Sequence, residues 1–450
     1  MNKPKNENYA AVVVEIKTLL PLANCDNVQA AIIMGNQVIV DKRVQAGAIG
    51  LYFPLETQLS EPYLKANNLY RKPELNADQT QKGYFEENGR IRCVKFRGNK
   101  SEGLFMPLQS LDFTPTSFAD LRLGDCFDEM DGIEICRKYV IKKHNTPGTP
   151  GSKKDKQSKK YESKLVENQF RFHQDTSMLY KNIHRINPDS LISITYKLHG
   201  TSGISSYVLC KRHIPMREKI GAFFHNLYTN ITTFGKQRFR LETTQYDYLF
   251  ASRKVIKNEQ LNPNAEHFYD ANIWEYAHDQ LKMHLQKGMT FYYEIVGYMP
   301  SGLMIQKDYD YGCNVGLHKA YIYRITYTNT DGKVFEFSAK QVQDFCKKNG
   351  LNAVPQLYYG FAKDFLHFQI TTEQDSEFYL NDWRNTFLEY LKQQYNEKDC
   401  YICKTKVPEE GVVIRIEEND FEAYKAKSNA FYERETKLLD KGESNIEDDN

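Results

Sequence analysis

Short apolar runs separated by turn residues fill the first part of the chain. The runs are Ala11–Ile16, Ala30–Met34, Gln37–Val40 and Ile49–Phe53. Gly35-Asn36 lies between the second and third runs, and such a dipeptide between apolar segments is typical of a β-hairpin. Several short strands at this spacing predict a small antiparallel β-barrel, which leaves no free sheet edge. Residues 55–88 are then expected to form a long loop on that barrel.

From residue 165 onward the pattern changes to longer strands mixed with helices. Alternating or continuous apolar positions predict strands at residues 191–196, 291–297, 411–415 and 421–427. Apolar residues at helical spacing predict helices at residues 269–287, 339–348 and 382–394. The chain is therefore expected to be an α+β protein in which antiparallel sheets are flanked by helices.

One segment between the two parts is too polar to form a core. Pro, Gly, Ser and Lys dominate residues 145–160, which favours a solvated spacer over a tether that contacts phosphates. We predict four parts, with these bounds: a first unit at 8–135, a basic flexible linker at 136–164, a second unit at 165–439 and a disordered acidic tail at 440–450.

The composition of the chain indicates its cellular compartment and limits the classes of binding partner that are expected. The net charge of +2 gives no global nucleic-acid signature, so any basic surface must be local. Nine scattered cysteines suit reduced thiols, and Cys400-Tyr401-Ile402-Cys403 alone is a weak zinc signal. No apolar run approaches the roughly 18 residues of a membrane span, and no apolar secretory segment follows Met1. We expect an intracellular, cytoplasmic protein without a membrane partner.

The most informative stretch is Lys197-Leu198-His199-Gly200-Thr201-Ser202, directly after the strand predicted at 191–196. Burying a charged amine at a strand end costs free energy, so a lysine at such a position is expected to have a functional role. Desolvation and a nearby cation lower the pKa of a lysine and make it a nucleophile. A lysine that merely extends to solvent at a strand-to-turn junction is the simpler alternative.

Three further motifs favour a functional role for Lys197 over this simpler alternative. Glu294 lies in an apolar strand, Glu410 precedes the strand from Gly411, and Lys425 and Lys427 share one face of a strand. Two carboxylates suit a hard divalent cation, and lysines suit phosphates. Each motif alone could be a solvated strand face, but all four in this order favour a site. The neighbouring Glu409 is expected to be a solvated turn residue.

In this order the motifs resemble the covalent nucleotidyltransferase superfamily of RNA ligases, DNA ligases and mRNA capping enzymes. Its signature is Lys-x-Asp-Gly, a Glu-Gly strand motif, Glu-Gly-Val-Val-x-Arg and a final Lys-x-Lys. The segment from Lys197 to Gly200 resembles the variant of phage-type RNA ligases, in which histidine replaces the aspartate. DNA ligases and capping enzymes typically keep the aspartate, so His199 argues against them.

The first unit also resembles a known module. Residues 10–107 look like the N-terminal oligonucleotide-binding (OB) module of RNA ligases from bacteria and amoebae. The segments that carry the likeness are 10–16, 22–26, 89–98 and 101–107. Residues 182–185, just before the strand that precedes Lys197, also look like that branch of RNA ligases. Two departures stand out. Arg324 replaces an acid of the family pattern, and residues 213–246 and 364–406 look like insertions.

The resemblance implies an N-terminal OB-like β-barrel followed by an ATP-grasp-like nucleotidyltransferase domain of antiparallel sheets flanked by helices. It implies an ATP-dependent RNA ligase that uses Mg²⁺ or Mn²⁺ and joins RNA 3′-hydroxyl and 5′-phosphate ends. The intermediates would be lysyl-AMP and adenylylated RNA, and the enzyme would act as a monomer in RNA repair. The preferred RNA, whether nicked duplex, splinted or single-stranded, stays open.

The resemblance also assigns roles to residues. Lys197 would attack ATP, Glu294 and Glu410 would hold the metal, and Lys425 and Lys427 would contact the α-phosphate. Further ATP contacts would come from Tyr196, His199, Gly200, Ser202, Arg253 and Tyr323. Ser202 stands where phage-type enzymes usually have asparagine. Tyr321 is the alternative to Tyr323 as the aromatic residue on adenine, and a plain core role is possible for either.

In the first unit, Arg90, Arg92, Lys95 and Arg97 are expected on one strand from 90 to 97. Basic residues on an OB surface suit a nucleic-acid backbone, although they could equally brace the module against the second unit.

Two other functions remain as alternatives. A DNA ligase or capping guanylyltransferase carries its OB domain after the catalytic domain, and the short stretch after Lys427 does not accommodate one. A non-catalytic OB protein that binds nucleic acid would have no need for intact Lys197, Glu294 and Glu410.

Overall fold

The computed structural model describes residues 3–116, 118–140, 165–232, 241–258, 272–366, 377–418 and 420–441. Most of the predicted linker and nearly all of the predicted acidic tail lie outside the described residues. Cys136–Lys138 form strand β13 and pair with β6 (Thr57–Leu59). The folded first unit therefore extends into the range predicted as linker.

The N-terminal unit contains the four predicted strands. A four-stranded antiparallel sheet has the order β10 (Cys126–Phe127), β1 (Ala11–Glu15), β5 (Ile49–Phe53), β9 (Leu104–Pro107). A three-stranded antiparallel sheet has the order β2 (Thr18–Pro21), β3 (Val28–Ile33), β4 (Asn36–Asp41). Two small hairpins, β7 (Val94–Phe96) with β8 (Asn99–Ser101) and β11 (Glu129–Met130) with β12 (Ile133–Glu134), complete it. The predicted hairpin is confirmed, with Met34 and Gly35 at its turn, both at positive φ.

The closed barrel is not confirmed, because the pairing of the described strands divides them into separate sheets. Strand β1 shows a physical reason. Its Ala11 and Val13 pack into one core, and its Val12 and Val14 pack into a second core with the β3–β4 hairpin. Both faces of this strand are thus covered by protein. The expected long loop at 55–88 is also wrong, since it contains β6 and helix α1 (Glu61–Ala66), which begins at the N-cap Ser60.

The second unit consists of two larger sheets with helices on their outer faces. The first sheet has the order β17 (Thr244–Ala251), β16 (Thr201–Lys211), β18 (Met289–Gly297), β19 (His318–Thr328), β20 (Val334–Glu336), with β21 (Asn352–Ala353) beside β19. The second has the order β14 (Ser177–Met178), β24 (Phe421–Lys427), β23 (Gly411–Glu417), β15 (Leu191–Tyr196), β22 (Gln356–Phe361). Most of the pairs are antiparallel, and β14–β24 and β19–β21 are parallel. The expected α+β class with antiparallel sheets and flanking helices is confirmed.

The helices agree with the sequence pattern where capping signals were present. They are α3 (Leu179–Asn182), α4 (Met216–Thr232), α5 (Ile273–Leu281), α6 (Ala339–Asn349), α7 (Ala362–Phe365), α8 (Glu377–Tyr395) and α9 (Asn429–Asp440). The helices predicted at 339–348 and 382–394 are α6 and α8, whereas α5 is shorter than predicted. Ser338 and Gln341 form a capping box on α6, and Gly350 ends that helix in the left-handed conformation.

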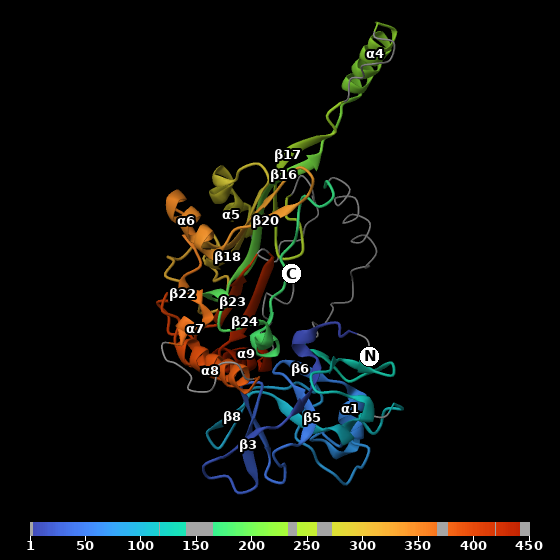
Figure 1. Cartoon of the computed structure of the whole chain (residues 1–450), viewed down its shortest axis with the longest axis vertical. Helices are drawn as coiled ribbons and strands as arrows, with labels where there is room; N and C mark the ends of the chain where they lie inside the picture. The colour runs from blue at the N-terminus through green and yellow to red at the C-terminus, as the bar shows by residue number, and fades with distance from the viewer. Residues whose placement is uncertain are drawn as a thin grey trace.

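The described residues of the region 213–246, which resembles an insertion, extend the molecule. Strands β16 and β17 continue as a two-stranded arm, and α4 lies beyond it, at the end of the molecule opposite the N-terminal unit (Figure 1). None of the described helices is long and apolar enough to span a membrane.

Candidate functional site

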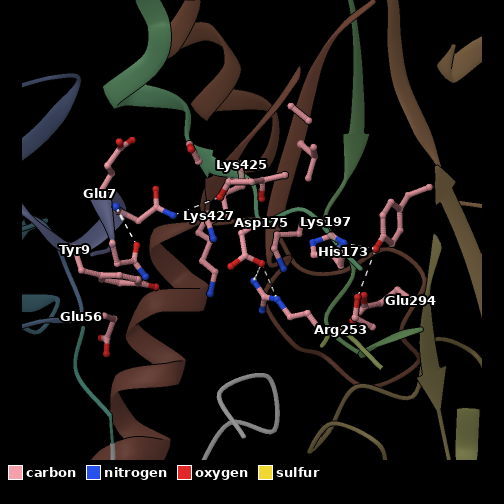
Figure 2. Close-up of a pocket in the computed structure, with 18 of the residues that line it drawn as sticks. Glu7, Tyr9, Glu56, His173, Asp175, Lys197, Arg253, Glu294, Lys425 and Lys427 are labelled. Carbon is pink, nitrogen blue, oxygen red and sulfur yellow. Dashed lines mark hydrogen bonds and ion pairs between the residues drawn. The ribbon is translucent and has the colours of Figure 1, made fainter. Parts of the chain in front are cut away.

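A cavity of about 630 Å³ lies between the two large sheets and is bordered by the N-terminal segment Lys3–Tyr9 (Figure 2). Most of the predicted site residues line it: Tyr196, Lys197, Ser202, Arg253, Glu294, Tyr323, Lys425 and Lys427. Among the described residues, nine Lys and Arg residues and five Asp and Glu residues line the cavity. Its lining is therefore more basic than the chain as a whole, and anionic groups are the ligands it favours.

Lys197 stands at the end of β15, where the sheet fixes its backbone. Its N–H donates to the carbonyl of Gly411 at 2.8 Å. Its Nζ lies 2.6 Å from Oε1 of Glu410, whose side chain has 0% exposure. The Nζ of Lys427 lies 3.7 Å from the same oxygen. One buried carboxylate therefore holds two lysines that are far apart in the sequence.

Glu294 is on the opposite sheet, in β18, and is buried. Its Oε1 accepts a hydrogen bond from the N–H of Gly200 at 3.1 Å. A Cβ at Gly200 would lie 2.3 Å from the carbonyl oxygen of Ile295, so the close approach of these backbones requires glycine. The turn after Lys197 is thereby tied to the strand that carries Glu294.

Three predicted residues of the active site, Gly200, Glu410 and His199, are not among the described residues that line the cavity. His199 is buried. Its ring packs edge-on against Tyr309 and Phe431, with centroids 5.0 and 4.9 Å away. Its backbone N–H donates to the hydroxyl of Tyr311 at 2.6 Å. No local pattern marks Tyr309 or Tyr311, which lie in the connection between β18 and β19, far from His199 in the chain.

Tyr323, rather than Tyr321, lines the cavity. The hydroxyl of Tyr323 is 2.8 Å from Nδ1 of His173 and 3.4 Å from Oγ of Ser202. Burial raises the pKa of the Tyr323 phenol well above its usual value, so this group stays neutral. Tyr321 packs instead in a core cluster with Leu198 and Val296.

Arg253 lines the same cavity and is held by an acid that sequence reasoning missed. Its guanidinium bonds Oδ1 of Asp175 at 2.8 and 2.5 Å (Figure 2). The residues of the N-terminal segment, with Glu56 and Lys138, were also missed as lining residues. No local motif marks any of them, because only the tertiary fold brings them to the cavity.

Two carboxylates flank Lys197 and could hold a divalent cation. Glu410 contacts its amine, and Glu294 contacts the Gly200 turn. Mg²⁺ keeps several waters and needs few protein ligands, so this donor set fits it. In the described part of the chain, no group of three or more His, Cys, Asp and Glu residues is arranged to hold a metal, so Cys400 and Cys403 gain no support as a zinc site.

The four basic residues of the N-terminal unit do not share one strand, so the predicted strand from 90 to 97 is wrong. Only Val94–Phe96 form a strand, and Arg97 has a φ of 46° in the following turn. Arg90 is buried, donates to both oxygens of Glu56 at 2.9 and 2.8 Å, and lies 3.4 Å from Asp440 at the end of α9. Arg92 is 3.1 Å from the same Asp440. These two arginines brace the units, whereas Lys95 and Arg97 are exposed.

Glu409 is not the solvated turn residue that was expected, since its exposure is 2%. Burial, with smaller contributions from Cys400 and Glu410, raises the pKa of its carboxyl to about 9. Two hydrogen bonds hold this turn in the interior. The carbonyl of Pro408 accepts from the Tyr309 hydroxyl, and the Cys400 N–H donates to the carbonyl of Val407.

We expect Glu409→Gln to make the protein more stable in alkaline solution. The unfolded carboxyl titrates near 4.5, so between pH 4.5 and 9 the folded protein binds a proton that the unfolded chain has released. Stability therefore falls as pH rises through that window, and glutamine removes this loss. Thermal melts should show a gain of several degrees at pH 8.5 and little change at pH 5. An equal difference at both pH values would contradict the assignment.

The comparisons with known proteins agree with this fold. No family model and no curated protein matches the sequence. Among solved structures, the chain is similar to the Naegleria gruberi RNA ligase. A variant of that ligase with AMP and Mn gives a TM-score of 0.54 at 16% identity, covering 94% of this chain and 98% of that chain. An apo variant gives 0.55 at 16% identity, covering 96% and 99%. A variant with ATP and Mn gives 0.53 at 16% identity, covering 96% and 99%. This likeness establishes the fold.

Proposed function

We propose that this chain is an ATP-dependent RNA ligase that joins RNA 3′-hydroxyl and 5′-phosphate ends. The observation that carries the proposal is the contact of Lys197 and Lys427, which both line a basic cavity, with one buried carboxylate, Glu410. The order of the sequence motifs supports it, as does the similarity in fold to an RNA ligase whose solved structures contain ATP or AMP with Mn.

The first step forms a covalent protein–nucleotide bond. The Nζ of Lys197 attacks the α-phosphorus of ATP, a P–N bond forms, the bond to the β-phosphoryl oxygen breaks, and pyrophosphate leaves. Lys425 and Lys427 line the cavity on one strand, where their charges can offset negative charge that develops on the phosphoryl group. The chemistry relies mainly on such positioning.

Lys197 must lose a proton before it can attack, because an ammonium has no free electron pair. Its partner Glu410 favours the ammonium form while the two are paired. Glu294 and Glu410 are the residues that would hold Mg²⁺ or Mn²⁺, and a cation there would disfavour the charged amine and neutralise phosphate charge. The donor set of two carboxylates fits that role.

The later steps transfer AMP to RNA. A 5′-phosphate oxygen attacks the lysyl-AMP phosphorus and frees Lys197, and an RNA 3′-hydroxyl then attacks the activated 5′-phosphate and releases AMP. Arg253 and Tyr323 are proposed to hold the ribose and the adenine. Taken from the sequence resemblance, the proposal extends to a monomeric enzyme of RNA repair in the cytoplasm.

The direct test is incubation of the full chain with α-labelled ATP and Mg²⁺, followed by denaturation. We expect label to stay on the protein, GTP to label it poorly, and nicked duplex RNA to be sealed. A protein that retains no label with either Mg²⁺ or Mn²⁺ would contradict the proposal.

The exposed strand β7 and the turn that follows it are proposed to contact RNA phosphates. Lys95→Glu combined with Arg97→Glu should weaken RNA binding and reduce its salt slope by about two, because each lost phosphate contact removes about one released counterion. Lysine–AMP formation should not change. The control is Lys42→Glu, an exposed residue of the same unit. An unchanged salt slope would leave the unit with a bracing role alone.

A further inference from the structure

The cavity extends past the lysines along the sheet that carries them. On neighbouring strands, Val413 pairs with Thr195 and with Lys425. Two residues further along β23, Arg415 pairs with Ser193 and with Ala423. Residues two apart on a strand share a face, and all six of these residues line the cavity. The row that contains Arg415 therefore lies about 7 Å beyond the row that contains Lys425.

Arg415 is buried there with hydrogen-bonding capacity unused. Its exposure is 6%, and its Nε and Nη1 have no hydrogen-bond partner among the described residues. Its guanidinium lies over the ring of Phe421, 5.1 Å from the centroid. Burial lowers its pKa from the usual value, yet an arginine stays charged in a protein. Donors that are buried without an acceptor are costly.

The charge of Arg415, in contrast, is balanced. Oε1 of Glu417 is 3.7 Å from its Nε, and the Glu417 side chain has 1% exposure. The oxygens of Glu417 are engaged elsewhere: Oε1 accepts from Oγ of Ser193 at 2.6 Å, and Oε2 accepts from the N–H of Ala339 at 2.9 Å. Arg324 also lies over the Phe421 ring, 4.1 Å from its centroid, and its Nε donates to Oε2 of Glu336 at 3.0 Å. What this end of the cavity lacks is a hydrogen-bond acceptor rather than a negative charge.

The walls near Arg415 suit a flat ring. Val413, Phe421 and Val354 supply apolar or aromatic surface, and Tyr323 faces the same cavity from the other sheet. A neutral heteroaromatic ring with nitrogen acceptors matches both the walls and the donors, whereas a phosphate would bring charge to a pair that is already neutral. The lysines at the other rows remain available for phosphates.

We propose that Arg415 donates a hydrogen bond to a ring nitrogen of the purine base and thereby recognises the base of the bound nucleotide. The inference rests on the proposed function, because it requires a nucleotide in this cavity. Arg415 then contacts the base, while Lys197, Lys425 and Lys427 act on the phosphate.

Binding of AMP and of 1-deaza-, 3-deaza- and 7-deaza-AMP by the full chain tests this. The protein is first treated with pyrophosphate, which attacks any lysyl-AMP to give ATP and the free lysine, and is then desalted. We expect one of the three analogues to bind the parent protein about tenfold or more weakly than AMP, as expected for a lost hydrogen bond from a charged donor. Arg415→Met should bind AMP weakly by the same factor and should no longer distinguish that analogue from AMP.

Several outcomes would overturn the inference. If the parent protein binds all three analogues as tightly as AMP, no ring nitrogen is read, and this result needs no variant. If Arg415→Met still discriminates between AMP and the weak analogue, another residue reads the base. Arg415→Lys keeps a donor and should retain part of the discrimination, which decides the matter should the methionine variant not fold. Lys211→Met, an exposed change at the end of β16, is the matched control. A complete lack of AMP binding would reject the nucleotide site itself, which is a failure of the proposed function.

Discussion

Lys197→Met should lower the formation of the protein–AMP adduct by more than about a thousandfold, because the variant has no nucleophile for the α-phosphorus. Methionine has a similar length and can occupy the channel that the lysine stem uses. Glu410 keeps Lys427 as a partner at 3.7 Å, so the fold should persist. Label retained after denaturation is the measurement for the first step, and a melting curve checks the fold.

A second substrate tests whether the same variant has lost only its nucleophile or has also lost the ability to bind and seal RNA. RNA that already carries a 5′-adenylyl group needs no lysine nucleophile, so Lys197→Met should still seal it in a nicked duplex. Lys211→Met, outside the cavity, should behave as the parent protein in both assays. Adduct formation by Lys197→Met at a rate near that of the parent would refute the assignment of the nucleophile.

Glu410→Gln is expected to lower both the stability of the fold and the rate of adduct formation. The amide leaves Lys197 without the carboxylate that now lies 2.6 Å from its amine. Removing one partner of a buried ion pair costs about 3–5 kcal/mol, and the partial exposure of both lysines should keep the loss toward the lower end of this range. Adduct formation should fall at least a hundredfold, because the cation site and the alignment of Lys197 are lost together.

Matched variants make this prediction specific. Glu294→Gln keeps an oxygen that can accept from the Gly200 N–H, so it should lower adduct formation with a much smaller loss of stability. Glu418→Gln changes an exposed acid beyond β23 and should alter neither property. A Glu410→Gln protein with unchanged melting temperature would show that the buried pair contributes little to the fold.

Local patterns predicted the parts of the site that lie on single strands. The alternation in residues 421–427 placed Lys425 and Lys427 on one face, and both line the cavity. The apolar run before Lys197 placed that residue at a strand end, where β15 ends at Tyr196. These features depend on neighbours two residues apart, so the sequence contains them directly.

The remaining features depend on residues that only tertiary packing brings together. The bond between Tyr323 and His173 joins different elements, and so does the pairing of Arg90 with Glu56. A basic residue is usually expected at the surface, but Arg90 is buried, because its partner Glu56 comes from another segment. The closed barrel is not confirmed for a related reason, because a strand pattern does not reveal that a second layer covers β1.

The sheet that carries Lys197 also constrains the order in which the protein can fold during synthesis. Strand β15 has two neighbours, and its Ser193 pairs with Tyr359 on one side and with Arg415 on the other. Both neighbours are translated long after β15. Until then, the apolar residues and backbone groups of β15 have no native partners in the nascent chain. Pairing over such sequence distances is slow and leaves apolar strands open to aggregation. The nascent chain is thus expected to depend on chaperones until β23 and β24 emerge, and catalytic competence should be the last property that it acquires.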